Sequence, residues 1–223
     1  MLQPFGGFPT MGSLAAQGYP RVSRRGSRMN RYARIPPPAA AGIPAPSLSM
    51  TPKALGEHLA HLVWESFSDF LTDEEPRELM SDMGLAQEEG LPDERVAGEL
   101  LIFHLWSHTR AVQLAFVGTP AEARLRETLD ALHQAFFQDM VENGTPEAHL
   151  PVFEQRVSSR YSEYYAAAED SDARVGQAVL AHLAPRIETS REQGTMALAL
   201  TERAIELTNP LRDFLRDVEF VES

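Results

Sequence analysis

Apolar residues recur at helical spacing along the chain from residue 51 onward. The first run has Leu55, Leu59 and Leu62, followed by Phe67 and Phe70. Apolar residues spaced by three or four positions predict an amphipathic helix with one face in the core. By the same criterion we predict helices over residues 52–71, 92–117, 120–142, from 151, 172–184 and 187–208, with a short helix in TDEEPRELMSDMG at 72–84 and a last one in PLRDFLRDVEF at 210–220. No stretch alternates with a period of two over enough positions to predict a strand. We therefore expect an all-α fold, a single bundle of six to eight helices.

The predicted helix starts share a threonine followed by a proline. Thr51, Thr119 and Thr145 each precede a proline. This order is typical of an N-cap followed by the first helical residue, and Glu122 would complete a capping box with Thr119. The matching helix stops are predicted at Gly84, Gly118 and the pair Asn143 and Gly144.

The first 50 residues differ in composition from the rest of the chain. They contain half of all the prolines, including IPPPAAAGIPAP, and show no helical or strand period. We expect residues 1–50 to form a disordered Arg/Pro/Gly-rich arm or leader, and residues 51–223 to form the helical domain. Three interpretations of the first segment stand side by side: a basic arm, a transit peptide, and an upstream extension ahead of a true start at Met50.

Charge separates the same two parts. Residues 1–49 carry six arginines and no Asp, Glu or Lys, so subtracting their +6 from the net charge of −12 leaves −18 for residues 50–223. An acidic domain repels phosphate backbones and anionic lipids, which argues against nucleic-acid binding by the folded part and favours a basic partner. Charged and histidine residues interrupt the longest apolar run, so no transmembrane segment is predicted. We expect a soluble, cytoplasmic protein, or an organellar one if residues 1–49 are a transit peptide.

Two histidines four residues apart lie in the apolar run GELLIFHLWSHTRAVQLAF at 98–116. On a helical wheel His104 and His108 point away from Glu99 and Arg110, which are expected on the solvent-exposed face of the helix. The histidines share a stripe with Leu101, Ala111 and Ala115, and this spacing is typical of the seam between packed helices.

Two interpretations of the pair follow. Two imidazoles at positions i and i+4 suit a helical zinc or haem site, which needs a third ligand from another helix, such as His133, Glu154 or His182. The Glu-x-x-His signature of di-iron bundles does not occur. The other interpretation is structural: neutral, half-buried histidines bonded to backbone carbonyls, tyrosines or a carboxylate. We adopt the structural interpretation, so His104, His108 and His133 stay metal-ligand candidates only and no cofactor is predicted.

A tyrosine cluster in RYSEYYAAAED offers a second candidate site. Tyr161, Tyr164 and Tyr165 combine apolar rings with polar hydroxyls, which suits a partner or ligand surface as well as a helix core. No phosphate-binding loop, dinucleotide fingerprint, nucleophile elbow or paired-acid motif occurs, and cysteine is absent. No catalytic residue is therefore predicted.

Three segments between residues 96 and 183 resemble the ubiquinol–cytochrome c chaperone family. They are LLIFHLW followed by Arg110, then LHQAFFQDM, then RYSEYYAAAED. The resemblance implies an all-helical, non-enzymatic assembly factor in which His104 and Trp106 belong to the scaffold. In this chain only Arg156 and Arg160 stand where that family is richly basic.

These observations lead to two expectations of function from different classes. The first is a non-enzymatic helical binding or assembly protein, chaperone-like for a helical client. The second is a metal-, haem- or small-molecule-binding helical protein built around His104, His108, His133 and the tyrosines.

Overall fold

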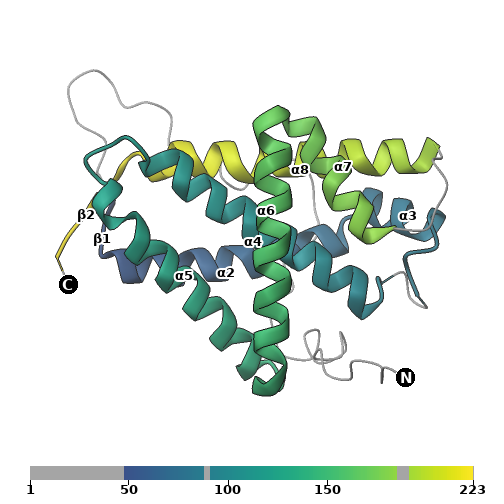
Figure 1. Cartoon of the computed structure of the whole chain (residues 1–223), viewed down its shortest axis with the longest axis horizontal. Coiled ribbons are helices and arrows are strands. Elements are labelled where there is room, and N and C mark those ends of the chain that lie inside the picture. Colours follow the sequence, from purple (N-terminus) through teal and green to yellow (C-terminus); the bar gives the residue numbers. More distant parts are fainter. Residues whose placement is uncertain (1–47, 88–90, 185–190, 223) are drawn as a thin grey trace, which may run out of the picture.

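The computed structural model describes residues 48–87, 91–184 and 191–222, and the fold of this part is all-α as expected (Figure 1). Seven α-helices make up most of it. In chain order the elements are β1 (Leu48–Met50), α2 (Pro52–Thr72), α3 (Glu74–Asp82), α4 (Glu94–Phe116), α5 (Glu122–Glu142), the 3-10 turn η3 (Glu147–His149), α6 (Leu150–Asp170), α7 (Asp172–Leu183), α8 (Arg191–Leu215) and β2 (Val218–Phe220). None of the described helices is long and apolar enough to cross a membrane.

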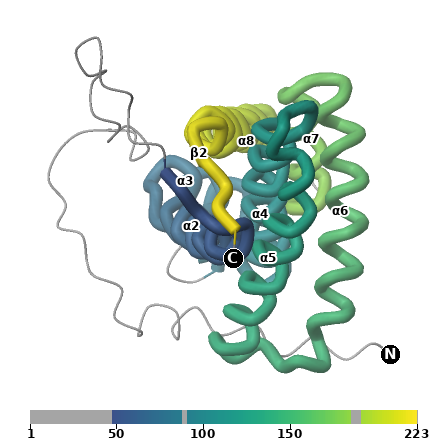
Figure 2. Tube along the Cα trace, turned by 90° about the vertical axis from the view of Figure 1, so that its left-hand side faces the viewer, coloured from purple at the N-terminus to yellow at the C-terminus, as the bar shows by residue number. Residues whose placement is uncertain are grey.

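Helix α4 is the centre of the bundle. Seventeen of its 23 residues are buried, and α2, α5, α6, α7 and α8 all pack against it. Figure 2, a view of the end where β1 and β2 lie, shows α4 among these helices and α6 on the outer flank. The prediction that Glu99 and Arg110 lie on a solvent-exposed face of α4 is therefore wrong, because Glu99 is buried and Arg110 is largely covered. A helix that is apolar on most of its faces is surrounded by other helices, and single charged residues do not create a solvent-facing side.

The helix ends confirm part of the predicted capping. Thr51 accepts a hydrogen bond from the backbone N–H of Ala54, as an N-cap does. Gly84, Gly118 and Gly144 all have positive φ angles, so all three predicted stops are confirmed.

The other two predicted caps are wrong. Helix α5 begins at Glu122, three residues after Thr119, and the carboxylate of Glu122 accepts from the backbone N–H of Gly118. The Thr119 hydroxyl donates to the carbonyl of Phe116, the last residue of α4, and accepts from the backbone N–H of Ala121, which precedes the first residue of α5. At Thr145 the chain first forms η3 before α6 starts, so this hydroxyl caps no helix. In both places further turn residues lie between the threonine and the first residue of the next helix, so the threonine is not the N-cap.

Close helix pairs depend on two glycines. A Cβ built on Gly56 of α2 would lie 2.5 Å from the Cβ of Ala131 and 2.7 Å from the backbone N of Leu132, both in α5. A Cβ on Gly176 of α7 would overlap the carbonyl oxygen of Ala197 in α8. Such contacts are far inside van der Waals distance, so the α2–α5 and α7–α8 pairs pack at spacings that only glycine permits.

The C-terminal part differs from the expectation in two ways. Residues 187–208 and 210–220 were predicted as separate helices, but Arg191–Leu215 form the single helix α8, which contains Pro210. The end of the second segment, Val218–Phe220, is the strand β2 and not helix. Buried Leu207, Leu211 and Leu215 continue one apolar stripe across the proline, and this packing compensates for the lost backbone hydrogen bond. The predicted break at Pro185 lies outside the described residues.

The structure contains a short pair of parallel strands, although no strand was predicted. Leu48 pairs with Val218 and Met50 with Phe220, and the Phe220 ring lies 5.1 Å from the ring of Phe116 at the end of α4. Three-residue strands are too short to show a period in the sequence. The boundary at residue 50 therefore moves, because residues 48–50 belong to the folded part; residues 1–47 lie outside the described residues.

Candidate functional site

The two histidines of α4 lie in the middle of the core, with no exposed surface. The Nδ1 atom of His104 is 2.8 Å from the carbonyl oxygen of Leu100, and Nδ1 of His108 is 2.9 Å from the carbonyl oxygen of His104. Side chains on a helix lean toward the preceding turn, which brings each ring to the carbonyl four residues earlier. A carbonyl only accepts, so each Nδ1 carries the proton and each Nε2 presents a lone pair.

Burial keeps both rings neutral. It lowers the pKa of His108 to about 4, although the bond to the His104 carbonyl opposes the shift. Burial also lowers the pKa of His104 well below its usual value, and the nearby positive charge of Arg203 adds to this effect. The structure therefore agrees with the expectation that both histidines are neutral and bonded to backbone carbonyls. The rings were expected to be half buried, but they are fully buried.

Aromatic rings surround His104. The ring centroids of Phe67, Phe70 and Phe103 lie 5.8, 5.4 and 5.3 Å from that of His104, all at steep interplanar angles. The Nε2 atoms of His104 and His108 are buried without a hydrogen-bond partner among the described residues. Within residues 48–87, 91–184 and 191–222, no group of three His, Cys, Asp or Glu side chains is placed to hold a metal ion.

His133 of α5 belongs to a different cluster. Its Nδ1 is 2.8 Å from the Leu129 carbonyl oxygen, and its Nε2 is 3.1 Å from the hydroxyl of Tyr161 in α6. The Tyr161 hydroxyl also lies 3.0 Å from the hydroxyl of Thr109 in α4. Burial lowers the pKa of His133 and raises that of Tyr161, so both side chains stay neutral. This cluster joins three helices through neutral hydrogen bonds.

The remaining tyrosines and third-ligand candidates are dispersed. Tyr164 is fully buried, and the rings of Tyr164 and Tyr165 lie 5.7 and 5.6 Å from the ring of Trp106 in edge-on arrangements. Glu154 is exposed, and His182 contacts the carboxylate of Glu163 at 2.6 Å. The structure therefore brings Tyr161 to His133, and it does not assemble these residues around His104 and His108.

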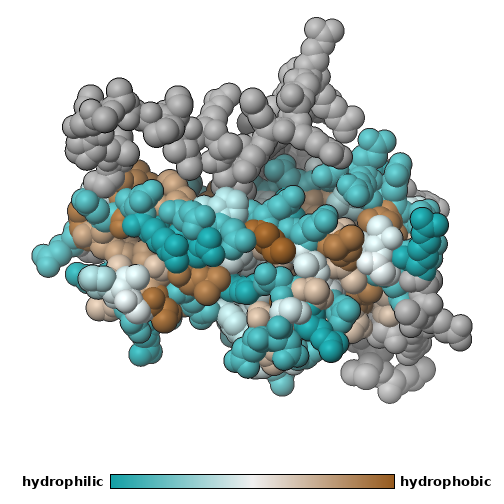
Figure 3. Space-filling model, turned by 90° about the horizontal axis from the view of Figure 1, so that it is seen from above, coloured by the Kyte–Doolittle hydropathy of each residue, from teal (hydrophilic) through white to brown (hydrophobic). Residues whose placement is uncertain are grey.

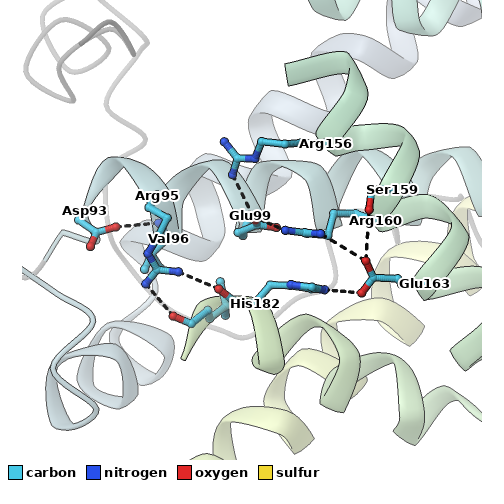
Figure 4. A network of polar contacts seen from close by, with 10 residues as sticks. Asp93, Arg95, Val96, Glu99, Arg156, Ser159, Arg160, Glu163 and His182 are labelled. Carbon is cyan, nitrogen blue, oxygen red and sulfur yellow. Dashed lines mark hydrogen bonds and ion pairs between the residues drawn. The ribbon is translucent and has the colours of Figure 1, made fainter. Parts of the chain in front are cut away.

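A network of polar contacts centres on Glu99, which we expected on a solvent-exposed face (Figure 4). Its side chain is 5% exposed and receives hydrogen bonds from Arg156 at 3.0 Å and from Arg160 at 2.8 and 3.1 Å. Burial alone would raise the pKa of Glu99, but the bonds from Arg160 and Arg156 outweigh it and the pKa is lowered. A carboxylate inside the apolar run GELLIF was the available signal, because a buried charge requires a partner.

The same network continues into α7. Arg160 also lies 3.3 Å from Glu163, and Arg95 of α4 donates to the carbonyls of His182 and Leu183 at 2.7 and 2.8 Å (Figure 4). Those carbonyls belong to the last turn of α7, where cations are favoured. Ion pairs and helix-end contacts thus hold α4, α6 and α7 together.

Two open depressions of about 220 and 210 Å³ lie on the described part of the surface. The first is lined by Arg110, Gln113, Leu114, Tyr165, Ala168 and Glu169, and the second by Glu57, His61, Ala135, Gln138, Asp139 and Glu142. Neither includes His104 or His108. Both are smaller than the sites that enclose most small-molecule ligands.

Comparisons with models of protein families, with curated proteins and with solved structures found no match to this chain. Function must therefore be inferred from the chain's own residues, since a fold alone does not define one.

Proposed function

We propose that this protein is a non-enzymatic binding or assembly protein, chaperone-like for a helical client. Support comes from the distribution of its side chains. The side chains best suited to bind a metal or to react pack or pair inside the bundle. They are His104, His108, His133, Tyr161 and Glu99. By contrast, half of the large apolar side chains that are exposed in the described part lie at one end of the molecule.

We call this region the apolar end and define it by Leu48, Val117, Phe214 and Val221. Their exposed fractions are 44, 58, 37 and 43%, and they are four of the eight large apolar side chains exposed in the described part. Figure 3 shows brown surface at the end where Figure 1 places β1, β2 and the last turns of α8. Exposed apolar surface concentrated in one place is typical of protein-binding sites, and this concentration carries the proposal.

The resemblance to ubiquinol–cytochrome c chaperones supports a helical client. The three segments that carry it lie on α4, α5 and α6. They meet where His133 contacts Tyr161 and where Trp106 packs against Tyr164. Under this proposal the three helices form the frame that holds the binding surface in place.

Native affinity purification of the full chain, followed by quantitative mass spectrometry, tests this function. A protein partner enriched at near-equal amounts is expected, and the variant Val117→Asp/Val221→Asp should lose it. The matched control is Leu198→Asp/Ile205→Asp, which changes exposed apolar residues on α8 and should keep the partner. Equal recovery of the partner by both variants would show that the apolar end does not bind it. Recovery of no partner by the wild type or by either variant would contradict the proposed function itself.

One observation favours the alternative of a metal or haem protein. The Nε2 atoms of His104 and His108, which have no partner in the described part of the chain, are unprotonated as a metal ligand needs. Metal analysis and an absorption spectrum of untagged protein decide between the two functions. A stoichiometric metal or a Soret band that disappears in His104→Gln/His108→Gln would favour the alternative.

A further inference from the structure

Three carboxylates lie beside the apolar end without a cationic partner among the described residues. Asp217 follows the last turn of α8, Glu219 is the middle residue of β2, and Glu222 follows that strand. All three are exposed, and none forms an ion pair within the described part of the chain. Val221, an exposed member of the apolar end, stands between Glu219 and Glu222 in the sequence.

Nearby arginines do not neutralise these three acids. Arg212 pairs with Asp213 at 2.8 Å, and Arg216 lies 3.7 Å from the same carboxylate. Each arginine is thus directed to Asp213. Phe214 and Val221 thus stand close in the sequence to these three acids, in a part of the protein that already carries −18 over residues 50–223.

The strand pair fixes this arrangement. Val221 donates its backbone N–H to the carbonyl of Met50 at 3.1 Å, and the Phe220 ring packs on Phe116. Backbone pairing therefore holds Val221 and its acidic neighbours on the same frame as Leu48 and the end of α4. A surface fixed in this way pays little ordering entropy when a partner binds.

We propose that the apolar end binds a segment of a partner protein that carries apolar side chains flanked by lysine or arginine. The apolar side chains pack against Val117, Phe214 and Val221, and the basic ones pair with Asp217, Glu219 and Glu222. This inference rests on the proposed binding function and names the chemistry of the partner. An acidic segment would bind poorly, because it would bring like charges together beside Asp217, Glu219 and Glu222.

The test uses the full chain and two synthetic peptides of about 20 residues, one of leucine and lysine and the other of leucine and glutamate with the same leucine pattern. Each carries a fluorophore and a photo-reactive group. Fluorescence anisotropy is expected to show binding of the basic peptide only, and binding should weaken in about 0.5 M salt. Cross-links should map to residues 114–120 and 213–222.

Three variants locate the contribution of each surface. Val117→Asp/Val221→Asp should raise the dissociation constant of the basic peptide about tenfold, and Asp217→Asn/Glu219→Gln/Glu222→Gln should raise it by a similar factor and reduce its salt dependence. Leu198→Asp/Ile205→Asp alters exposed apolar residues elsewhere and should leave it unchanged. Thermal unfolding by circular dichroism verifies that all three variants fold.

Four outcomes would overturn the inference. They are equal affinity for both peptides, cross-links elsewhere on the surface, a wild-type dimer in sedimentation that Val117→Asp/Val221→Asp converts to monomer, and peptide binding that appears only after residues 1–47 are removed. The last two would show that a second copy or the chain's own first segment covers the apolar end. Recovery of a native partner despite failed peptide binding would refute this inference and leave the binding function standing.

Discussion

The buried histidine His108 should make the stability of this protein fall in mild acid. Its pKa is about 4 in the folded protein, against an ordinary value of 6.5. Because the folded pKa is the lower one, the unfolded chain takes up a proton over this range while the folded protein does not. Stability is therefore complete above about pH 6.5 and is lost as the pH falls toward 4. Between about pH 7.5 and pH 5 the loss from this one group is about 2 kcal/mol. His104 adds a loss of the same sign.

Urea unfolding followed by circular dichroism across this pH range measures the effect. His108→Gln should lower stability at pH 7.5, because the packing changes, but its further loss on going to pH 5 should be smaller than that of the wild type by about 2 kcal/mol. His58→Gln is the matched control, since it alters an exposed histidine and keeps both buried rings. If the free energy of unfolding fell by the same amount between pH 7.5 and pH 5 in the wild type and in His108→Gln, the assignment of a neutral, buried imidazole would be refuted.

Three further substitutions test the packing and the polar networks, each by urea unfolding. Gly176→Ala should cost about 2 kcal/mol or more, because the added Cβ overlaps the backbone of α8, whereas Gly194→Ala, with open space around it, should be neutral or stabilise by up to about 1 kcal/mol; equal effects would mean that α7 and α8 are not closely packed. Glu99→Gln should cost about 3 kcal/mol, since it leaves two partly covered arginines without their carboxylate; no measurable loss would show that the pairs are not formed. Tyr161→Phe should cost about 1 kcal/mol by leaving Nε2 of His133 unpaired, and an unchanged midpoint would exclude that bond.

The helices could be predicted because their apolar spacing is local information. The run from Leu55 to Phe70 lies on α2, and the first and last residues of α2 were predicted within one position. Glycines with positive φ marked the helix stops for the same reason. The strand pair could not be predicted, since Leu48 and Val218 are far apart in the sequence and come together only through the tertiary fold. The continuity of α8 across Pro210 likewise depends on tertiary packing that outweighs local preference.

The candidate site was only half predictable. The carbonyl bonds of His104 and His108 follow from helical geometry, so the sequence suffices for them. The environment of Glu99 could not be predicted, because a helical wheel assumes one solvent-exposed face, whereas 17 of the 23 residues of α4 are buried. Its partners Arg156 and Arg160 come from α6, and no local pattern shows which helix will lie opposite a buried acid. The apolar end is also a tertiary feature, assembled from β1, α8 and the residues that directly follow α4 and β2.

Native mass spectrometry of the untagged full chain, purified from its own source, tests the central claim most directly. It weighs a protein partner and a small cofactor in the same sample. We expect the intact chain together with a second protein, a complex that His104→Gln/His108→Gln retains and Val117→Asp/Val221→Asp loses. A chain without a partner that carries one metal ion or haem, lost in His104→Gln/His108→Gln, would contradict the account.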